Sequence, residues 1–203
     1  MKKSFLIVVC LSIFSNILAQ KTNPILFFDL GLGYAKEINN SGGIIQYGSI
    51  NYEKNKNLFT ARYSEFNQLS VKAIPITPVT PIPFPSSDFK NTEVGILYGR
   101  RFIEDNFAYS FSVGISTNKY EIYKKDDYDK TYTESKNYAG CPFEISIKWF
   151  KSEKSPYRIY ELIPVGKPTA LGNSVGFKFL GNISKHSFMG IGLDFGIGYH
   201  KEY

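Results

Sequence analysis

The stretch 93-EVGILYGRRFIEDNFAYSFSVGIS-116 decides the fold, because it predicts two β-strands joined by a tight polar turn. In its second half, large apolar side chains alternate with very small ones. One face of that strand carries Phe107, Tyr109, Phe111, Val113 and Ile115, and the other carries Ala108, Ser110, Ser112, Gly114 and Ser116. A soluble sandwich would place Lys, Glu and Thr on the second face. The small residues instead indicate a narrow closed barrel that is apolar outside and crowded inside.

The same two-residue period recurs along the whole chain of 203 residues, a length that suits one domain. Further strands are predicted at 25–36, 43–52, 59–64, 139–150, 172–183 and 189–200. In the segment 43–52 the alternation slips, and a β-bulge at Gly48 would restore it. The predicted fold class is therefore all-β, a transmembrane antiparallel up-and-down β-barrel of eight strands. Residues 151–171 fit either a folded turn or an extra hairpin, and a hairpin there would give ten strands.

The first residues have the order of a secretory signal. Lys2 and Lys3 precede an apolar run from Phe5 to Ile13, and small residues follow up to Ala19. The run is too short to span a bilayer as a helix. We therefore expect a signal peptide at 1–19, cleaved after Ala19 or Gln20, and a single barrel domain at 20–203.

Composition limits the partners and cofactors. The formal net charge of +6 comes from charges of mixed sign clustered in loops, which does not point to nucleic acid. The two histidines and the single cysteine of the mature chain, Cys141, do not form a recognised metal-site spacing. Asp126, Asp127 and Asp129 do not match a calcium loop. No metal and no cofactor is expected.

Two long connections stand out, at 67–92 and at 117–138. Five of the ten prolines fall between Pro75 and Pro85, and this density of missing donors predicts an extended loop of polyproline type. Its apolar residues are expected to pack over the barrel rim. They are Ile74, Ile76, Val79, Ile82 and Phe84. An adhesive, partner-binding segment is the alternative. The second connection is polar, holds five tyrosines and is expected to be a loop.

The stretches EVGILYGRRF, FAYSFSVGIS, FEISIKWF and FKFLGNISKHSFMGIGLDFGIGY, with a leader ending in LAQ, resemble the small eight-stranded outer-membrane β-barrel proteins common in Bacteroidota. The resemblance implies a place in the cell outer membrane, among its lipids. It also implies that the barrel-assembly machinery reads the last strand through Phe195, Ile197 and Tyr199. The tail Lys201–Tyr203 departs from that pattern and leaves open which tyrosine is the terminal signal. The long segment after Phe150 departs from the usual short turn.

Some barrels of this size modify lipids with a His and a Ser or an acid near the outer rim. His186, with Ser184 and Ser187, is the candidate for such chemistry in this sequence. A histidine in a polar turn is more simply a surface residue, and we prefer that interpretation. His200 is expected at the membrane interface on the opposite side.

Charged residues also fall on the inward face of the predicted strands. The lumen of an eight-stranded barrel has room only for side chains, so buried charges must pair with one another or with trapped water. We expect an internal salt-bridge network, with a proton or ion path as the alternative. The residues are Asp29, Arg62, Glu93, Glu144, Lys148, Lys178 and Asp194.

Three functions fit these patterns. The preferred one is a structural or surface-interaction barrel that acts through extracellular loops, with a possible extracellular partner, and is neither an open porin nor an enzyme. The first alternative is an outer-leaflet enzyme that modifies lipid A, as a hydrolase or acyltransferase. The second is a soluble lipocalin-like barrel, whose apolar face should point inward around a ligand.

Overall fold

The structure is a computed structural model that describes residues 25–38, 42–77, 80–86, 89–125, 131–151, 153, 157–159, 163–165 and 171–201. The predicted signal peptide at 1–19 lies outside the described residues, and so do Asp126, Asp127 and Asp129. Among the described residues, no helix is long and apolar enough to cross a membrane.

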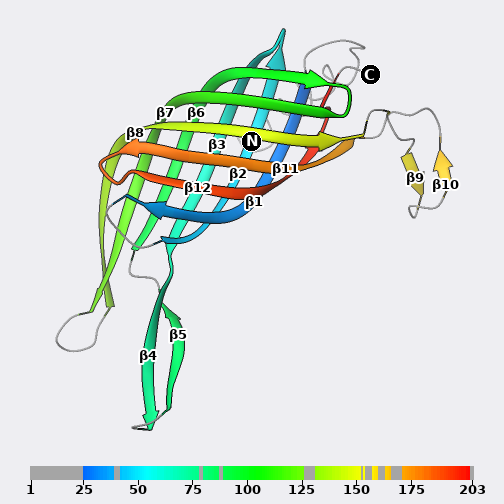
Figure 1. The fold of residues 1–203 in the computed structure, drawn as a ribbon. Coiled ribbons are helices and arrows are strands. Elements are labelled where there is room, and N and C mark those ends of the chain that lie inside the picture. The colour runs from blue at the N-terminus through cyan, green and yellow to red at the C-terminus, as the bar shows by residue number, and fades with distance from the viewer. Residues whose placement is uncertain are drawn as a thin grey trace, which may run out of the picture.

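Eight long strands close into one antiparallel barrel (Figure 1). The spatial order is β1-β12-β11-β8-β7-β6-β3-β2, and β1 also pairs with β2, which closes the barrel. The bounds are β1 Ile25–Glu37, β2 Gly42–Lys54, β3 Asn57–Gln68, β6 Phe89–Glu104, β7 Phe107–Lys125, β8 Thr131–Phe150, β11 Gly172–Ser184 and β12 Phe188–Gly198. The predicted all-β barrel of eight strands is confirmed.

Large apolar side chains point away from the lumen along these strands. Ile96 on β6 and Ile115 on β7 are 68% and 76% exposed, whereas Leu97, the residue that follows Ile96, is fully buried. The outward face therefore forms an apolar belt around the barrel, and the inward face carries the buried charges and small residues together with a cluster of apolar side chains near one end. A lipocalin-like barrel would have the reverse arrangement, so the structure does not support that alternative.

The predicted bulge at Gly48 is wrong. The register of β2 runs without interruption against both β1 and β3. Ile45 and Tyr47 point into the lumen instead, where both are buried. The space exists because Gly31 lies opposite Tyr47 on β1, and a Cβ at Gly31 would overlap the tyrosine ring. A glycine on one strand thus makes room for a large side chain on the next.

The proline-rich segment forms a hairpin rather than a polyproline-type loop. β4 (Ser70–Thr77) pairs antiparallel with β5 (Thr80–Ser86). Pro81, Pro83 and Pro85 are two residues apart, so their nitrogens face the same edge of β5, and that edge needs no donors because it is unpaired. The hairpin projects beyond the barrel, which contradicts the expected packing of this segment over the rim (Figure 1). Of the apolar residues expected there, Val79 lies outside the described residues.

The expected loop at 117–138 is largely strand. β7 and β8 stay paired from Thr117↔Ala139 to Lys125↔Thr131, so the hairpin extends well past the rest of the barrel. Threonine and tyrosine favour extended structure, and a long two-stranded ladder satisfies the backbone of a polar segment. Asn118 and Tyr120 of this segment are buried in the lumen, whereas Lys119 is exposed on the outward face, so polar residues here alternate as in any other strand of the barrel.

Residues 151–171 contain a short hairpin, β9 (Tyr157–Ile159) with β10 (Ile163–Val165). These strands pair only with each other, so the ten-stranded barrel is excluded. This hairpin lies at the end of the barrel that also has the tight turns, with positive φ at Asn55, Lys56 and Asp105. We call this the turn end. The opposite end, from which β4–β5 and the β7–β8 extension project, is the hairpin end (Figure 1).

Candidate functional site

Arg62 on β3 lies at the centre of the lumen and binds two carboxylates. Its guanidinium donates to Glu93 Oε1 from Nε at 2.9 Å and from Nη2 at 2.7 Å, and to Glu144 Oε2 from Nη1 at 3.3 Å. The remaining N–H groups reach the backbone carbonyls of Phe143 and Gly181 at 3.1 and 3.2 Å. All three charged side chains are almost completely buried. The planar fork of arginine suits this site because it serves several acceptors at once.

Two lysines continue the network toward the turn end. Lys148 on β8 pairs with Asp29 and, at 2.9 Å, with Asp194. Lys178 on β11 lies 3.7 Å from both aspartates and 3.8 Å from Glu144, which links the lysines to the arginine cluster. Neutral donors complete the site, and Asn51 Nδ2 lies 2.7 Å from Asp29 Oδ2.

The structure thus brings all seven predicted lumen charges into one connected cluster. The space that remains among Asp29, Glu144, Lys148 and Lys178 is too small to admit a water molecule. Charges buried in this way cannot exchange their partners for water, so the loss of a cation leaves a carboxylate uncompensated. This arrangement fills and locks the lumen and does not resemble a conducting path.

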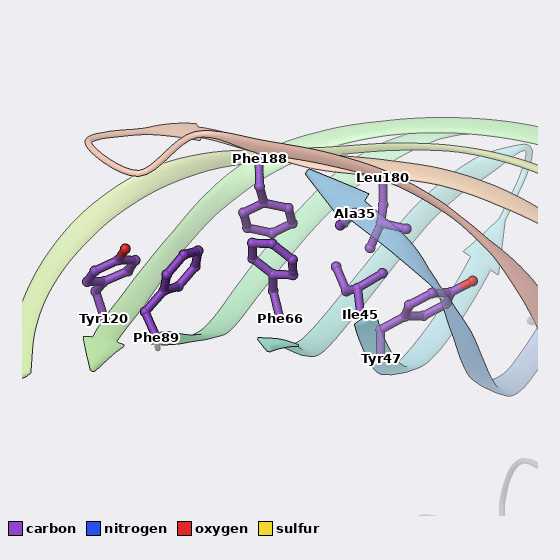
Figure 2. Close-up of a cluster of buried hydrophobic side chains, with 8 residues drawn as sticks. All are labelled: Ala35, Ile45, Tyr47, Phe66, Phe89, Tyr120, Leu180 and Phe188. Carbon is purple, nitrogen blue, oxygen red and sulfur yellow. The ribbon is translucent and has the colours of Figure 1, made fainter. Parts of the chain in front are cut away.

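An aromatic plug closes the lumen on the hairpin side of the charges, and the sequence interpretation did not anticipate it. The Phe66 ring stacks on Phe188 at a centroid distance of 5.7 Å, and Phe89 stacks on Tyr120 at 5.0 Å (Figure 2). The buried cluster consists of Ala35, Ile45, Tyr47, Phe66, Phe89, Tyr120, Leu180 and Phe188. These residues occupy alternate, inward-facing positions of their strands. This alternation is the sequence signal from which the plug could have been predicted.

A second cluster closes the lumen at the turn end. Arg101 pairs with Glu53 at 2.7 Å and lies 4.8 Å from the centre of the Phe27 ring. His200 is packed between the rings of Phe27 and Phe150. Arg101 is an even number of residues from Glu93 on β6, so a regular strand that continues to the turn places both side chains inward. The inward position of Arg101 could therefore have been predicted from the sequence.

His200 lies at the turn end, and its side chain is fully buried between Phe27 and Phe150 rather than exposed on the outside of the barrel. Burial, with further contributions from the positive charges of Lys148 and Arg101, lowers the pKa of this histidine from its usual 6.5 to about 3. The ring is therefore neutral at physiological pH, and it packs against aromatic rings to close the lumen at the turn end.

His186 lies at the hairpin end, in the turn between β11 and β12. Its Nδ1 is 2.9 Å from Glu37 Oε1, and its ring stacks on Tyr120 with centroids 3.7 Å apart. Tyr138 packs against the same ring. These contacts join the β11–β12 turn to β1 and to the β7–β8 extension. His186 is therefore a partly buried structural link rather than a free surface residue.

The two serines beside His186 are engaged with each other. Ser187 Oγ donates to the Ser184 carbonyl at 2.7 Å and accepts the Ser184 N–H at 2.9 Å. An oriented His–Glu pair is present, but Ser187 Oγ donates its hydrogen bond to the Ser184 carbonyl rather than to a base, as an activated nucleophile would. In the described part of the chain there is also no group of three His, Cys, Asp or Glu residues that could hold a metal ion.

No protein-family model matches this chain, and no curated protein matches it. Among solved structures the barrel is similar to Neisserial surface protein A (NspA), with a TM-score of 0.50, 12% identity, and coverage of 86% of this chain and 96% of that chain. Ail, the attachment invasion locus protein of Yersinia pestis, gives a TM-score of 0.48 at 9% identity, covering 87% and 98% of the two chains. The N-terminal β-barrel domain of Pseudomonas aeruginosa OprF gives 0.47 at 9%, covering 87% and 100%.

The likeness to NspA shows the fold and nothing further, because so low an identity carries no site residues. The class that follows is the closed eight-stranded antiparallel barrel of the outer-membrane type.

Proposed function

We propose that this chain is an integral outer-membrane barrel that acts at the cell surface through its hairpin end and does not conduct solutes. The observation that carries the proposal is the sealed lumen beneath the two projecting hairpins. Aromatic side chains close one end, a buried ion network fills the middle, and Arg101 with His200 closes the other end. A scaffold without a passage leaves its exposed loops and hairpins as the place for function.

Two features support the membrane location. The outward apolar belt covers every strand of the barrel, and a continuous apolar band around a closed barrel is typical of a barrel in contact with hydrocarbon. The turn end has short connections at 55–56 and 105–106, together with the longer 151–171 segment, whereas the two longest strand extensions, β4–β5 and β7–β8, project from the hairpin end. Short periplasmic turns and longer extracellular loops are typical of outer-membrane barrels, so the hairpin end faces outward in this proposal.

Fractionation and heat-modifiability test the location. The expressed protein should remain in the outer-membrane fraction after carbonate extraction, and it should migrate differently on gels before and after boiling. Recovery in the soluble fraction would overturn the proposal.

Planar-bilayer recording tests the closed lumen. Purified protein should give no stable large conductance. Truncation should not open it, because the plug and the ion network belong to the barrel itself. Steady porin-like conductance of the intact protein would show that the lumen is not sealed in solution.

Hairpin trimming tests the site of action. One variant replaces residues 70–87 with Asn-Gly. A second variant replaces residues 121–135 with Asn-Gly, so that the turn joins the paired residues Tyr120 and Lys136 and the Tyr120 ring of the plug is kept. Both variants should fold, and surface binding that the intact protein shows should be lost in one or both. Binding that survives both truncations would place the function elsewhere.

Substitution of His186 separates this proposal from the lipid-enzyme alternative, which the His186–Glu37 pair favours. His186→Gln should leave the lipid A of the host unchanged by mass spectrometry, and its main effect should be on the stability of the hairpin end. Loss of a lipid A modification would favour the enzyme instead.

A further inference from the structure

The outward face of the barrel has a groove over β1, β2, β3 and β6. Its volume is about 980 Å³, which is near the upper limit of roughly 300–1,000 Å³ for ligand pockets, and its lining is almost wholly apolar. Gly48 and Ala61 form its floor, because neither fills the outward position that a large side chain occupies elsewhere on the belt. Leu30, Tyr63 and Ile96 form its walls.

The depression at Gly48 is not required by the backbone. A Cβ added there would meet Leu30 Cδ2 at 3.4 Å and other atoms at 3.7 Å or more, which is ordinary van der Waals contact. At Gly99, by contrast, a Cβ would run into the backbone carbonyl of Phe111. The barrel therefore tolerates a larger residue at Gly48, and the groove is available space on the lipid-facing wall.

A polar cluster borders the groove on the side of the hairpin end. Glu65 on β3 accepts hydrogen bonds from Gln46 at 3.3 Å, Asn67 at 2.9 Å and Tyr63 at 3.2 Å, and it pairs with Lys90 at 2.7 Å. We call these five residues the Glu65 network. Gln46 and Tyr63 also line the groove, so the two features are continuous. At this level the outward face is apolar on β1, with Leu32 exposed, and polar on β6 and β7, where Thr92 and Lys119 follow Glu65.

The geometry points to a bound lipid with a phosphorylated sugar headgroup, one acyl chain lying over Gly48 and Ala61 and the headgroup against the Glu65 network. This inference rests on the membrane location proposed above. Gln46 and Asn67 each donate one amide N–H to Glu65, and each retains a side-chain carbonyl oxygen that can accept a hydrogen bond from a sugar hydroxyl. Lys90 uses one ammonium N–H on Glu65 and retains donors for a phosphate.

Lipid A of the outer leaflet has this chemistry, with saturated chains, sugar hydroxyls and phosphate. A phosphatidylethanolamine also offers a phosphate for Lys90, and its ammonium group can donate to the two amide oxygens, so the choice between the two lipids follows from the leaflet. The position of the Glu65 network toward the hairpin end also agrees with the outer leaflet. Because the hairpin end faces the outer leaflet in the function proposed above, and lipid A is the phosphorylated sugar lipid of that leaflet, the occupant is a lipid A molecule.

The test measures retained lipid by native mass spectrometry of folded protein in detergent, with purified lipid A or phosphatidylethanolamine added as the probe. Gly48→Leu combined with Ala61→Leu fills the groove. Val175→Leu is the matched control, because Val175 is an outward residue on β11 that does not line the groove. The wild type and Val175→Leu should retain lipid A, and the filled variant should lose it.

Lys90→Gln gives an independent measurement if the filled variant does not fold. It removes one charge-assisted hydrogen bond to phosphate, which should weaken lipid A retention about tenfold. Equal retention of phosphatidylethanolamine and lipid A by the wild type would overturn the inference, and so would unchanged retention in the filled variant or in Lys90→Gln. A wild-type protein that stays soluble without detergent and shows no heat-modifiable mobility would overturn the membrane proposal itself, which is a distinguishable result.

Discussion

Arg62→Met is the most informative perturbation of the ion network. Methionine is unbranched and apolar, so it occupies much of the same space but removes the charge. Glu144 keeps Lys178 at 3.8 Å. Among the described residues, Glu93 then keeps a neutral partner, the side-chain amide of Asn182, which donates to Glu93 Oε2 at 2.5 Å. The substitution therefore leaves a fully buried carboxylate without a cation.

The expected loss of unfolding free energy is about 3–5 kcal/mol, the usual cost of removing one partner from a buried ion pair. The double variant Arg62→Met/Glu93→Gln removes the uncompensated charge as well and should recover roughly half of that loss. Arg100→Met is the matched control. Arg100 is the neighbouring, outward-facing arginine, and its loss should change stability by less than about 0.5 kcal/mol.

The assay is urea unfolding of protein folded into lipid vesicles, followed by tryptophan fluorescence. Trp149 is the only tryptophan of the chain and lies on the outward face, so its emission reports transfer from lipid to water. The reasoning is refuted if Arg62→Met lies within about 1 kcal/mol of the wild type. It is equally refuted if the double variant is less stable than the single one.

Phe111→Arg or Ile145→Arg should each destabilise the barrel by about 2–4 kcal/mol in the same assay if the site is near the bilayer midplane, and tolerance of both would contradict a lipid-facing belt. Gly99→Val should prevent folding, because its side chain meets the Phe111 carbonyl, and a normal heat-modifiable band for this variant would contradict the close approach of the strands. His200, with its pKa lowered to about 3, stays neutral when folded but is protonated below pH 6.5 when unfolded. Stability should therefore fall as the pH drops from 6.5 toward 3, by up to about 1.4 kcal/mol per pH unit, and His200→Phe should lose this part of the pH dependence.

The alternation of side chains determined the barrel and the direction of its faces. A strand has a period of two, so the positions of Phe111 and Ser112, or of Ile145 and Glu144, specify opposite faces without any knowledge of the partner strand. Strands with bulky apolar residues on one face and small residues on the other are typical of a narrow barrel with an apolar exterior. The same parity placed the seven lumen charges inward.

Where the alternation conflicted with expected polarity, the sequence interpretation failed. Ile45 and Tyr47 are apolar like Ile50 and Tyr52 but fall on the other face of a regular strand, and the bulge predicted at Gly48 would put both pairs on one face. The space that accepts Ile45 and Tyr47 in the lumen depends on Gly31, a residue of the adjacent strand, and local sequence does not contain that information. The proline-rich segment failed for a related reason, since the cost of a proline depends on whether its edge of the strand is paired.

The tertiary structure alone decided which charges meet. Arg62 lies 31 residues from Glu93 and 82 from Glu144, and these pairs form because barrel closure and strand tilt bring β3, β6 and β8 to one level of the lumen. The burial of His200 likewise required Phe27 and Phe150, which come from distant strands. Periodicity is a property of each strand and can be read locally. Pairing across the lumen depends on the register and shear of the closed barrel, and only the folded chain sets these.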